Sequence, residues 1–472
     1  MTSRSTTPGT RASLPTEEFN GARSKHREDD PESGIPWLGR VPSHWQIEKL
    51  KYIARAQFSN VNKKTEEGEQ QVRLCNYVDV YYHDRITADI EFMEATAEPR
   101  EIAKFQLQMG DVLITKDSED PNDICVPAVV AEPLPGVLCG YHLAQVRPAP
   151  DRTHGPYLMY AFRSSGIRDQ FRMRANGITR FGLSQDDIRS ALFPLPPLSE
   201  QQAIAGWLDE RTRRIDGLVA AKRRLIGLLA EQRTALISHA VTKGLEPHAP
   251  MKPSGIDWLG DVPGHWEVKR LRYLFQNLNS RRVPLDAEDR SYREKVYPYY
   301  GASGIIDAVD EYIFDEPLIL VAEDGANLLS RSTPLAFIAS GKYWVNNHAH
   351  ILRPRAGPLR FWECALQLFD FTPLVSGSAQ PKLTIEQLSE VWLPVPPVAE
   401  QEQITAFIDR ACGGANGLDA LTAATETAIA RLTEYRQALI SAAVTGKINV
   451  CGGAAGATGA PADTGEYHGR TR

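Results

Sequence analysis

An internal repeat constrains the fold of this 472-residue chain more than any other feature. Residues 33–53 recur as residues 254–274 with 12 of 21 positions identical, and both copies keep a Trp-Leu-Gly, Val-Pro, His-Trp pattern. A Pro-rich segment at 194–210 recurs in the same way at 394–410. Because self-similarity at a long period marks a duplicated structural unit, the chain is predicted to contain two copies of one unit.

A third repeated segment shows which parts of the unit are retained. Residues 231–245 match residues 434–448 at 9 of 15 positions. The copies lie 221 residues apart at the first motif, 200 at the Pro-rich motif and 203 at the third. The interiors, 45–194 and 266–394, therefore differ in length and sequence, whereas the motifs that flank them are kept.

Both divergent interiors are predicted to be mixed α/β domains. Strand-like runs occur at 111–116 and 316–323, and helical stretches occur at 156–166 and 358–371. Gly and Pro turns separate these runs, as is usual between strands and helices. A chain of this length is also more easily buried around two cores than around one.

A long helix is predicted after each Pro-rich segment. Ser199 suits a helix N-cap, and Glu200 and Gln201 suit the positive first turn. Apolar residues follow at heptad spacing, namely Ile215, Leu218, Leu225, Leu229 and Leu236 in the first copy and Leu418, Leu421, Ala428, Leu432, Tyr435 and Leu439 in the second. A helix over 200–241 is about 60 Å long at ~1.5 Å per residue, and its apolar seam needs a partner in water. The two helices are therefore expected to pair with each other.

The second helix departs from the first at residues 411–417, where the sequence ACGGANG predicts a kink or a break. These motifs together divide the chain. The predicted parts are a disordered tail at 1–32, a globular domain at 33–196, a helix at 197–245, a linker at 246–253, a second globular domain at 254–396, a second helix at 397–448 and a disordered tail at 449–472.

Composition limits the class of protein without naming a ligand. The net charge is −6, from 53 basic and 59 acidic residues, which by itself does not favour a nucleic-acid binder. Basic clusters at 163–180 and 269–282 nevertheless predict a local basic face. The apolar runs are too short for a membrane span. The six cysteines form no C-x-x-C pair, which argues against a disulfide framework or a zinc knuckle and favours the reducing cytoplasm.

The reaction centres of familiar nucleic-acid enzymes are missing from the sequence. It contains neither a Walker phosphate loop nor the D/N-P-P-Y/F/W tetrapeptide of amino-methyltransferases. Gly301 and Gly304 match a fragment of a phosphate loop, but a turn between strands is the simpler interpretation. The acidic loop at 115–123 has the carboxylates of a magnesium-dependent nuclease but no E-x-K partner, which favours a solvated loop. No catalytic residue and no metal ligand is therefore assigned.

Several short stretches are candidates for contact with nucleic acid. The polar run at 346–350 carries Asn amides that suit adenine edges, with a structural turn and a metal site as the alternatives. Lys116 follows a buried-looking strand, a position from which a lysine reaches a phosphate. The segments 176–188 and 376–388 align across the halves, and each offers a Gly before a capped helix, which suits a phosphate or a plain turn. The candidate DNA-contacting residues are Lys116, Arg174, Gly177, Thr179, Arg180, Asn327, Asn346, Asn347, His348, Gly377, Ser378, Gln380 and Lys382.

The order of these motifs resembles one family. It runs W-x-G-x-x-P-x-H-W, a variable domain, P-L-P-P-L-x-E-Q, a heptad helix and A-L-I-x-x-A-V-T-G-K-I. This order is similar to that of the specificity (S) subunit of type I restriction-modification systems, over nearly all of residues 33–450. The resemblance implies two target-recognition domains that each read half of a split duplex DNA target, and two helices that form an antiparallel spacer.

The resemblance also implies partners and cofactors. The chain itself would be non-catalytic and would bind no cofactor, whereas two modification subunits would use S-adenosylmethionine and restriction subunits would use ATP and Mg²⁺. Glu200, Gln201, Glu400 and Gln401 would lie near the surface that docks these partners. The residues implied to pack the spacer are Ile215, Leu218, Leu229, Leu236, Leu418, Leu421, Leu432 and Leu439.

Two other classes of function remain open at this point. One is a scaffold protein whose variable domains bind protein or carbohydrate, which the acidic net charge favours. The other is a stand-alone nuclease with an unfamiliar reaction centre. A salt-dependent affinity for duplex DNA distinguishes the family's function from a scaffold, because only a DNA-binding protein releases counterions from the duplex.

Overall fold

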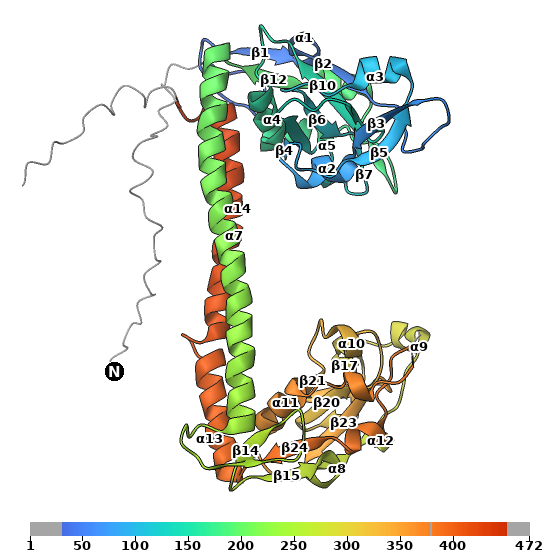
Figure 1. Cartoon of the computed structure of the whole chain (residues 1–472), viewed down its shortest axis with the longest axis vertical. Helices are drawn as coiled ribbons and strands as arrows, with labels where there is room; N and C mark the ends of the chain where they lie inside the picture. Colours follow the sequence, from blue (N-terminus) through green and yellow to red (C-terminus); the bar gives the residue numbers. More distant parts are fainter. Residues whose placement is uncertain (1–30, 378–379, 451–472) are drawn as a thin grey trace, which may run out of the picture. The chain divides into compact units, whose positions relative to one another are not determined.

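The computed structural model describes residues 31–377 and 380–450, and it divides into two units (Figure 1). Unit 1 comprises the chain up to Ala220 together with the chain from Ile429 onward, and unit 2 is Ala221–Ala428. The boundaries cut through both long helices, because helix segments from two distant parts of the sequence pack on each globular domain. The tails expected at 1–32 and 449–472 lie outside the described residues, apart from two residues at each inner end.

The globular part of unit 1 is a mixed α/β domain on a five-stranded sheet in the order β2-β10-β6-β8-β4, with a three-stranded sheet, β5-β3-β9, beside two small pairs, β1-β12 and β7-β11. Its strands are β1 (Gln46–Lys49), β2 (Ala54–Phe58), β3 (Gln70–Cys75), β4 (Arg85–Ile86), β5 (Met93–Ala97), β6 (Val112–Thr115), β7 (Asp117–Ser118), β8 (Pro127–Val130), β9 (Val137–Cys139), β10 (Leu143–Pro148), β11 (Phe181–Gly182) and β12 (Leu192–Leu195). Its helices are α1 (Leu50–Ile53), α2 (Tyr77–Tyr82), α3 (Pro99–Phe105), α4 (Gly155–Arg163), α5 (Ser165–Arg172) and α6 (Gln185–Ser190). The apolar strands β6 and β8 are buried throughout, as a strand covered on both faces requires.

The globular part of unit 2 is also mixed α/β, with two four-stranded sheets in the orders β16-β23-β20-β21 and β18-β17-β22-β19. Its strands are β13 (Met251–Pro253), β14 (Asp261–Pro263), β15 (Glu267–Arg270), β16 (Phe275–Asn277), β17 (Tyr297–Gly301), β18 (Gly304–Val309), β19 (Phe314–Asp315), β20 (Leu318–Ala322), β21 (Ala336–Ala339), β22 (Lys342–Val345), β23 (Ala349–Pro354) and β24 (Trp392–Val395). Its helices are α8 (Leu271–Leu274), α9 (Ala287–Ser291), α10 (Asn327–Ser330), α11 (Leu359–Leu368) and α12 (Ile385–Ser389). The segment expected as a linker at 246–253 ends in β13, which pairs with β14.

The retained motifs close each globular domain. The first motif supplies β1 and the Pro-rich motif supplies β12, which pair antiparallel with Gln46 opposite Leu195. In unit 2 the same pairing joins β15 and β24, with Glu267 opposite Val395. The two motifs are neighbours in space although 140 residues of sequence separate them in unit 1 and 119 in unit 2, and this explains why they are kept while the interior diverges.

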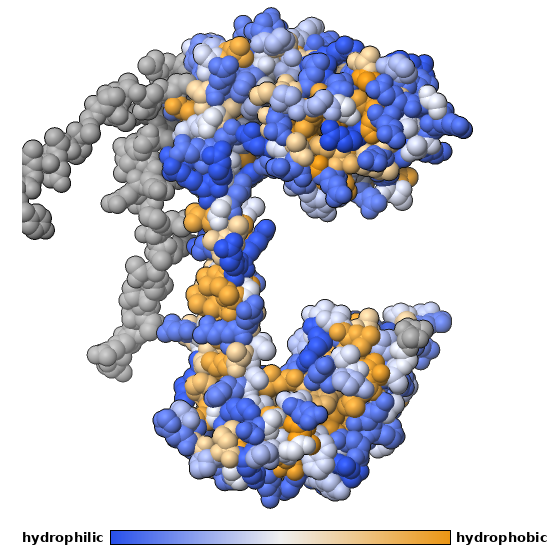
Figure 2. Space-filling view, viewed as in Figure 1, coloured by the Kyte–Doolittle hydropathy of each residue, from blue (hydrophilic) through white to orange (hydrophobic). Residues whose placement is uncertain are grey.

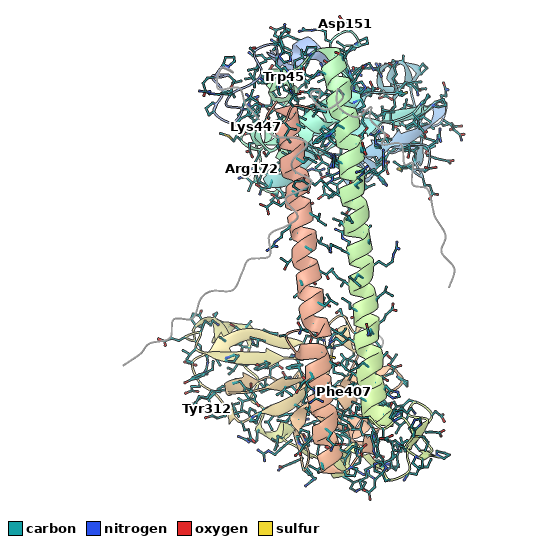
Figure 3. All side chains as sticks on the ribbon, turned by 90° about the vertical axis from the view of Figure 1, so that its left-hand side faces the viewer. Trp45, Asp151, Arg172, Tyr312, Phe407 and Lys447 are labelled. Carbon is teal, nitrogen blue, oxygen red and sulfur yellow. The ribbon has the colours of Figure 1, made fainter. Side chains whose placement is uncertain are left out.

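The long helices lie side by side (Figures 1 and 3). The first is α7 (Leu198–Lys243), and the second comprises α13 (Val398–Ile408), a π-helical turn at Asp409–Gly413 and α14 (Leu418–Val444). The expected interruption of the second helix is therefore confirmed. Its tight turn needs glycine, because a Cβ atom on Gly417 would lie 2.4 Å from the carbonyl oxygen of Cys412.

Matching ion pairs fix the pairing of the helices in each unit. In unit 1, Arg436 Nε lies 2.9 Å from Asp216 Oδ1, and in unit 2, Arg233 Nε lies 2.9 Å from Asp419 Oδ1. From the first pair to the second, the residue number rises on α7, from Asp216 to Arg233, and falls on α14, from Arg436 to Asp419. The two helices therefore run antiparallel. The structure thus has the antiparallel spacer that the resemblance implies.

Most of the residues predicted to pack the spacer lie in its apolar seam, but two of them do not. Ile215, Leu229 and Leu439 are buried as expected, and Leu236, Leu418 and Leu432 are partly buried. Leu218 and Leu421 are 54% and 47% exposed, so their expected seam packing is corrected. The seam continues at Val219 and Thr422, one residue further along each helix. Figure 2 shows apolar patches on the exposed surface of these helices.

Each long helix ends against the first motif of one globular domain. At the end of α7, a Cβ atom on Gly244 would lie 3.2 Å from the ring of Trp266, and at the end of α14, one on Gly446 would lie 2.5 Å from Pro42. Figure 3 labels Trp45 at this end of α14. Both glycines have positive φ, 78° and 75°. The order is Lys-Gly at 243–244 and Gly-Lys at 446–447, and both helices nevertheless end at a glycine with the same kind of backbone conformation. Among the residues described, no helix combines the length and apolarity that crossing a bilayer requires.

Candidate nucleic-acid interface

A short turn is anchored at the end of a buried strand in each globular domain. Asn176 and Gly182 exchange two backbone hydrogen bonds of 3.1 and 2.9 Å, and Ser376 and Lys382 exchange two of 2.9 and 2.8 Å. We call residues 176–182, and residues 376–377 with 380–382, the anchored turns. The residue after each turn donates its backbone N–H to the residue after a buried strand, Leu183 to Lys116 and Leu383 to Glu323. The two aligned segments therefore occupy the same place in both domains.

The anchored turns depend on glycine. Gly177 has φ +150°, and a Cβ atom there would lie 1.9 Å from the carbonyl oxygen of Arg180. Gly377 has φ +87°, and its Cβ atom would lie 2.6 Å from the carbonyl oxygen of Gln380. The first turn presents its tip to solvent, with Ile178 93% exposed and Thr179 and Arg180 also exposed. Ser378, one of the candidate contacts, lies outside the described residues.

A histidine–aspartate pair stands beside each anchored turn. His142 Nδ1 lies 3.0 Å from Asp117 Oδ2 in unit 1, and His348 Nδ1 lies 2.7 Å from Asp324 Oδ2 in unit 2. The backbone confirms that the pairs are equivalent, because Lys116 N–H donates to His142 and Glu323 N–H donates to His348. A carboxylate bonded to one ring nitrogen fixes the orientation of the imidazole and directs the other nitrogen outward.

Sequence reasoning found only His348 of these four residues. Asp117 and Asp324 each lie two residues after the last residue of β6 and β20, and they align with each other at an offset of 207 rather than the 200 of the anchored turns. Aligning the two strand ends separately from the turns would have revealed both aspartates. His142 had no local signal, because strand pairing alone brings it to Asp117.

In unit 1 the basic candidates differ in how far they are free to reach a ligand. Lys116 Nζ packs over the rings of Phe58 and Tyr141, 5.1 and 4.5 Å from their centroids, and burial lowers its pKa. Arg174 is held inside the domain by bonds of 3.1 Å to the Asp187 carbonyl and the Ser190 hydroxyl.

Arg180, on the anchored turn, is 2.6 Å from Asp117 Oδ1, and this hydrogen bond raises its pKa. It is the most exposed of the three cations, and it remains charged at any working pH. The strongest basic candidate of unit 1 is therefore Arg180 rather than Lys116 or Arg174.

In unit 2 a buried carboxylate occupies the place of Lys116. Glu323 is 8% exposed, and Lys382 Nζ and His350 Nδ1 lie 3.3 and 3.4 Å from its oxygens, with Arg282 also bonded. Burial alone would raise the pKa of Glu323, but its hydrogen bond to Arg282 and the nearby His350 and Lys382 lower it overall. The two domains therefore place opposite charges at the same position beside the anchored turn.

The remaining polar candidates of unit 2 divide between structural and exposed positions. Asn346 is buried, and its Oδ1 accepts the His348 backbone N–H at 2.8 Å, which favours the structural turn for this residue. Asn327 Oδ1 likewise accepts the Thr333 N–H at 2.9 Å and closes a loop. Asn347 and Gln380 are exposed. No group of three or more His, Cys, Asp or Glu within residues 31–377 and 380–450 is placed to hold a metal ion.

The two basic clusters in the sequence do not form a continuous basic face. Their side chains are largely bonded to groups of the same domain: Arg163 to Asp84, Arg168 to the Asn122 carbonyl, Arg172 to Asp169, Arg270 and Arg272 to Glu390, Arg281 to Glu316 and Arg282 to Glu323. These contacts neutralise most of the clustered charge. The cations next to the anchored turns, Arg180 and Lys382, are the ones placed beside a potential ligand.

The residues expected at a partner-docking surface fasten each helix to its domain. Gln201 and Gln401 are buried, and their amides donate to the Pro196 and Pro396 carbonyls at 2.9 and 2.8 Å. Their side chains are thus not available to a partner, which corrects the expectation for both glutamines.

The neighbouring glutamates bond to the first motif of the same domain. Glu200 Oε2 lies 2.9 Å from His44 Nε2, and Glu400 Oε2 lies 2.7 Å from His265 Nε2. Both carboxylates keep a partly exposed edge, at 20% and 21% of the side chain, so a docking role stays a prediction for them.

Comparison with known proteins gives a consistent result. Residues 263–418 match the model of the type I restriction modification DNA specificity domain. A putative type I restriction enzyme specificity subunit of Haemophilus influenzae is 36% identical over 145 residues, 30% of this chain and 36% of that protein. The putative MjaX specificity subunit of Methanocaldococcus jannaschii is 24% identical over 235 residues, 50% of this chain and 53% of that protein. The alignments thus span about a third to a half of these relatives.

A structural likeness covers more of the chain. A solved chain from work on complex assembly and conformational transition of the type I R-M system has a TM-score of 0.65 and 16% identity, and the match covers 86% of this chain and 99% of that one. At this identity the likeness concerns the fold. The matched domain and the relatives make this chain similar to type I restriction-modification specificity subunits, and the solved structure shares its fold.

Proposed function

We propose that this chain is the DNA-sequence-specificity subunit of a type I restriction-modification complex. It recognises a bipartite duplex target, one half with each globular domain, and it directs adenine methylation and restriction by partner subunits without catalysing either reaction. The observation that carries the proposal is the recurrence of one anchored turn and one histidine–aspartate pair in two domains whose interiors differ in sequence and length. A recurring scaffold with changed side chains suits the reading of two different half-sites.

The proposal assigns the catalytic chemistry to partners in the cytoplasm. Two modification subunits supply S-adenosylmethionine-dependent methylation of adenine, and restriction subunits use ATP and Mg²⁺. This chain holds no cofactor of its own. Glu200 and Glu400 and the exposed apolar residues Leu218 and Leu421 of the spacer are the surface proposed to meet these partners.

The proposed DNA contacts centre on the anchored turns. In unit 1, Thr179 and Arg180 lie on the exposed turn, and in unit 2, Gln380 and Lys382 lie on the turn with His348 beside them. Arg and Lys suit phosphates and guanine, and amides suit adenine. Gly177 and Gly377 keep the backbone of each turn free of side-chain bulk, so that a phosphate comes close to it.

Methylome sequencing tests the proposal. A host that expresses this chain together with its modification subunit is expected to gain N6-methyladenine at one new bipartite motif, and neither protein alone is expected to produce it. The sequence of the motif gives both half-sites. If the two proteins co-purify but no new motif is methylated, the proposed function is wrong and a scaffold role takes its place.

A single methyl group is expected to disrupt recognition of one half-site. In Gly177→Ala the new Cβ atom meets the Arg180 carbonyl oxygen, so the first anchored turn cannot close as it does here. We expect at least a ten-fold loss of affinity for the bipartite duplex, measured by fluorescence anisotropy at fixed salt. Gly182→Ala is the matched control, because nothing lies within 4 Å of its Cβ position. Equal affinity of the two variants would contradict a role for the turn.

A further inference from the structure

A cavity opens in unit 2 between α11 and the second half of α7, which Figure 1 shows next to each other. Its volume is about 550 Å³, enough for one or two side chains. Three arginines line it, Arg233 on α7, Arg331 after α10 and Arg360 on α11. The rest of the wall is mixed, with apolar side chains such as Phe337 and Leu368, polar side chains, and the carboxylate of Glu363, which is paired with Arg360. The cavity thus combines positive charge with apolar surface.

In unit 1, the equivalent stretch of α14 is covered by the globular domain. The third repeated segment aligns Arg233, Thr234 and Ile237 with Arg436, Gln437 and Ile440. In unit 1 the three latter residues contact the globular domain and seal the junction. Ile440 is fully buried, and Gln437 Nε2 donates to the Arg163 carbonyl at 2.5 Å.

A carboxylate completes this junction in unit 1. Asp84 lies 2.6 Å from Arg163 and 2.6 Å from Arg436, so one anion bridges a guanidinium of the domain and one of the spacer. In unit 2 the residues equivalent to the spacer side of this junction line the cavity instead. Asp84 of unit 1 therefore shows, within the same chain, that a junction of this kind accepts a carboxylate.

Arg331 is the cation best placed to receive an anion in the cavity. Arg233 is bonded to Asp419, and Arg360 is bonded to Glu363 and Asp409. Arg331 donates to the backbone carbonyl of Gln367, and among the described residues it forms no ion pair within 4 Å, although the Asp370 carboxylate lies near enough to interact with its charge. Its side chain is exposed while it also lines the cavity, and its backbone lies in the left-handed region with φ +50°.

We propose that this cavity binds an acidic side chain from a modification subunit, in the position that Asp84 fills in unit 1. The partner segment would carry an Asp or Glu for Arg331 and an apolar residue for Phe337 and Leu368. Charge complementarity favours an anion, and the apolar wall favours a protein segment over a phosphodiester, which would bring a row of charges against it. This inference rests on the proposed function, because that function supplies the partner.

Charge substitutions at Arg331 in the full-length chain test the inference. Arg331→Glu is expected to weaken binding of the purified modification subunit at least ten-fold in biolayer interferometry, and Arg331→Gln is expected to weaken it less. Arg410→Glu is the matched control, an exposed arginine of the same unit that does not line the cavity, and it is expected to stay within two-fold. Thr333→Trp fills the cavity without changing charge and is expected to reproduce the loss.

The outcomes separate this inference from the proposed function. If Arg331→Glu and Thr333→Trp both bind the modification subunit like the unaltered chain, the cavity is not a docking site, although the proposed function stands. If Arg331→Glu instead lowers the affinity of this chain alone for duplex DNA, the cavity accepts a phosphate and the inference is overturned. If the unaltered chain and modification subunit together methylate no motif, the proposed function itself fails.

Discussion

Trp266→Ala is expected to lower the free energy of unfolding of unit 2 by about 3–5 kcal/mol, the usual cost of emptying a fully buried aromatic site. Trp266 has 0% exposure, and it packs against Gly244 at the end of α7. Its indole Nε1 donates to Glu400 Oε2 at 3.0 Å, so the substitution also removes a partner of this carboxylate. Hydrogen exchange followed by peptide mass spectrometry measures the change, because peptides of units 1 and 2 report separately.

The equivalent tryptophan of unit 1 offers a matched control. Trp45 packs at the end of α14, but its buried Nε1 has no hydrogen-bond partner among the described residues. Trp266→Phe removes a charge-assisted hydrogen bond, whereas Trp45→Phe removes an unpaired donor. The substitution at Trp266 is therefore expected to cost about 1.5–3 kcal/mol more than the substitution at Trp45. Equal costs would show that the Glu400 contact contributes nothing to stability.

Asp84→Ala is expected to destabilise unit 1 by about 1–2 kcal/mol, because it leaves two largely buried guanidinium groups together, while the 42% exposure of Asp84 screens part of the cost. The side chains of Arg163 and Arg436 are only 17% and 16% exposed. Burial already lowers the pKa of Arg163, and the nearby charge of Arg436 lowers it further. Urea unfolding measures the loss. Adding Arg436→Met to Asp84→Ala is expected to restore part of the stability by relieving this repulsion.

The spacer ion pair of unit 2 provides the comparison. Arg233 and Asp419 are 39% and 50% exposed, so solvent screens their attraction. Asp419→Ala is therefore expected to cost only about 0.2–1 kcal/mol. A difference of less than about 0.5 kcal/mol between Asp84→Ala and Asp419→Ala would mean that the Asp84 network is as well solvated as an ordinary surface pair.

The sequence predicted the architecture well because its repeated motifs make the closing contacts of each unit. The first motif and the Pro-rich motif pair as strands, and the glutamine of the Pro-rich motif binds back to the turn that precedes its helix. Both contacts are made by short segments whose sequence is kept. The break in the second helix was also predictable, since two consecutive glycines at 413–414 disfavour a helix interior.

The interface was predicted only in part. Gly177 and Gly377 were found because the turns align locally, whereas His142 and Asp117 are 25 residues apart and meet only through strand pairing. The predicted register of the spacer was wrong at positions where two apolar residues are consecutive in the sequence. Leu218 and Val219 both suit a seam position, and the packing of the partner helix decides between them.

The division of the chain into units has a consequence for the order in which a ribosome produces them. Unit 2 is one continuous segment, Ala221–Ala428, but the core of unit 1 needs Leu439, Ile440 and Val444 from beyond it. At about 5–20 residues per second, the nascent first domain waits roughly 10–45 s for these residues. During that time the apolar face formed by Ile204, Leu208 and Ile215 lacks its partner helix. The domain that is translated first is thus the last to be completed, and a prematurely terminated chain would carry a finished second domain behind an unfinished first one.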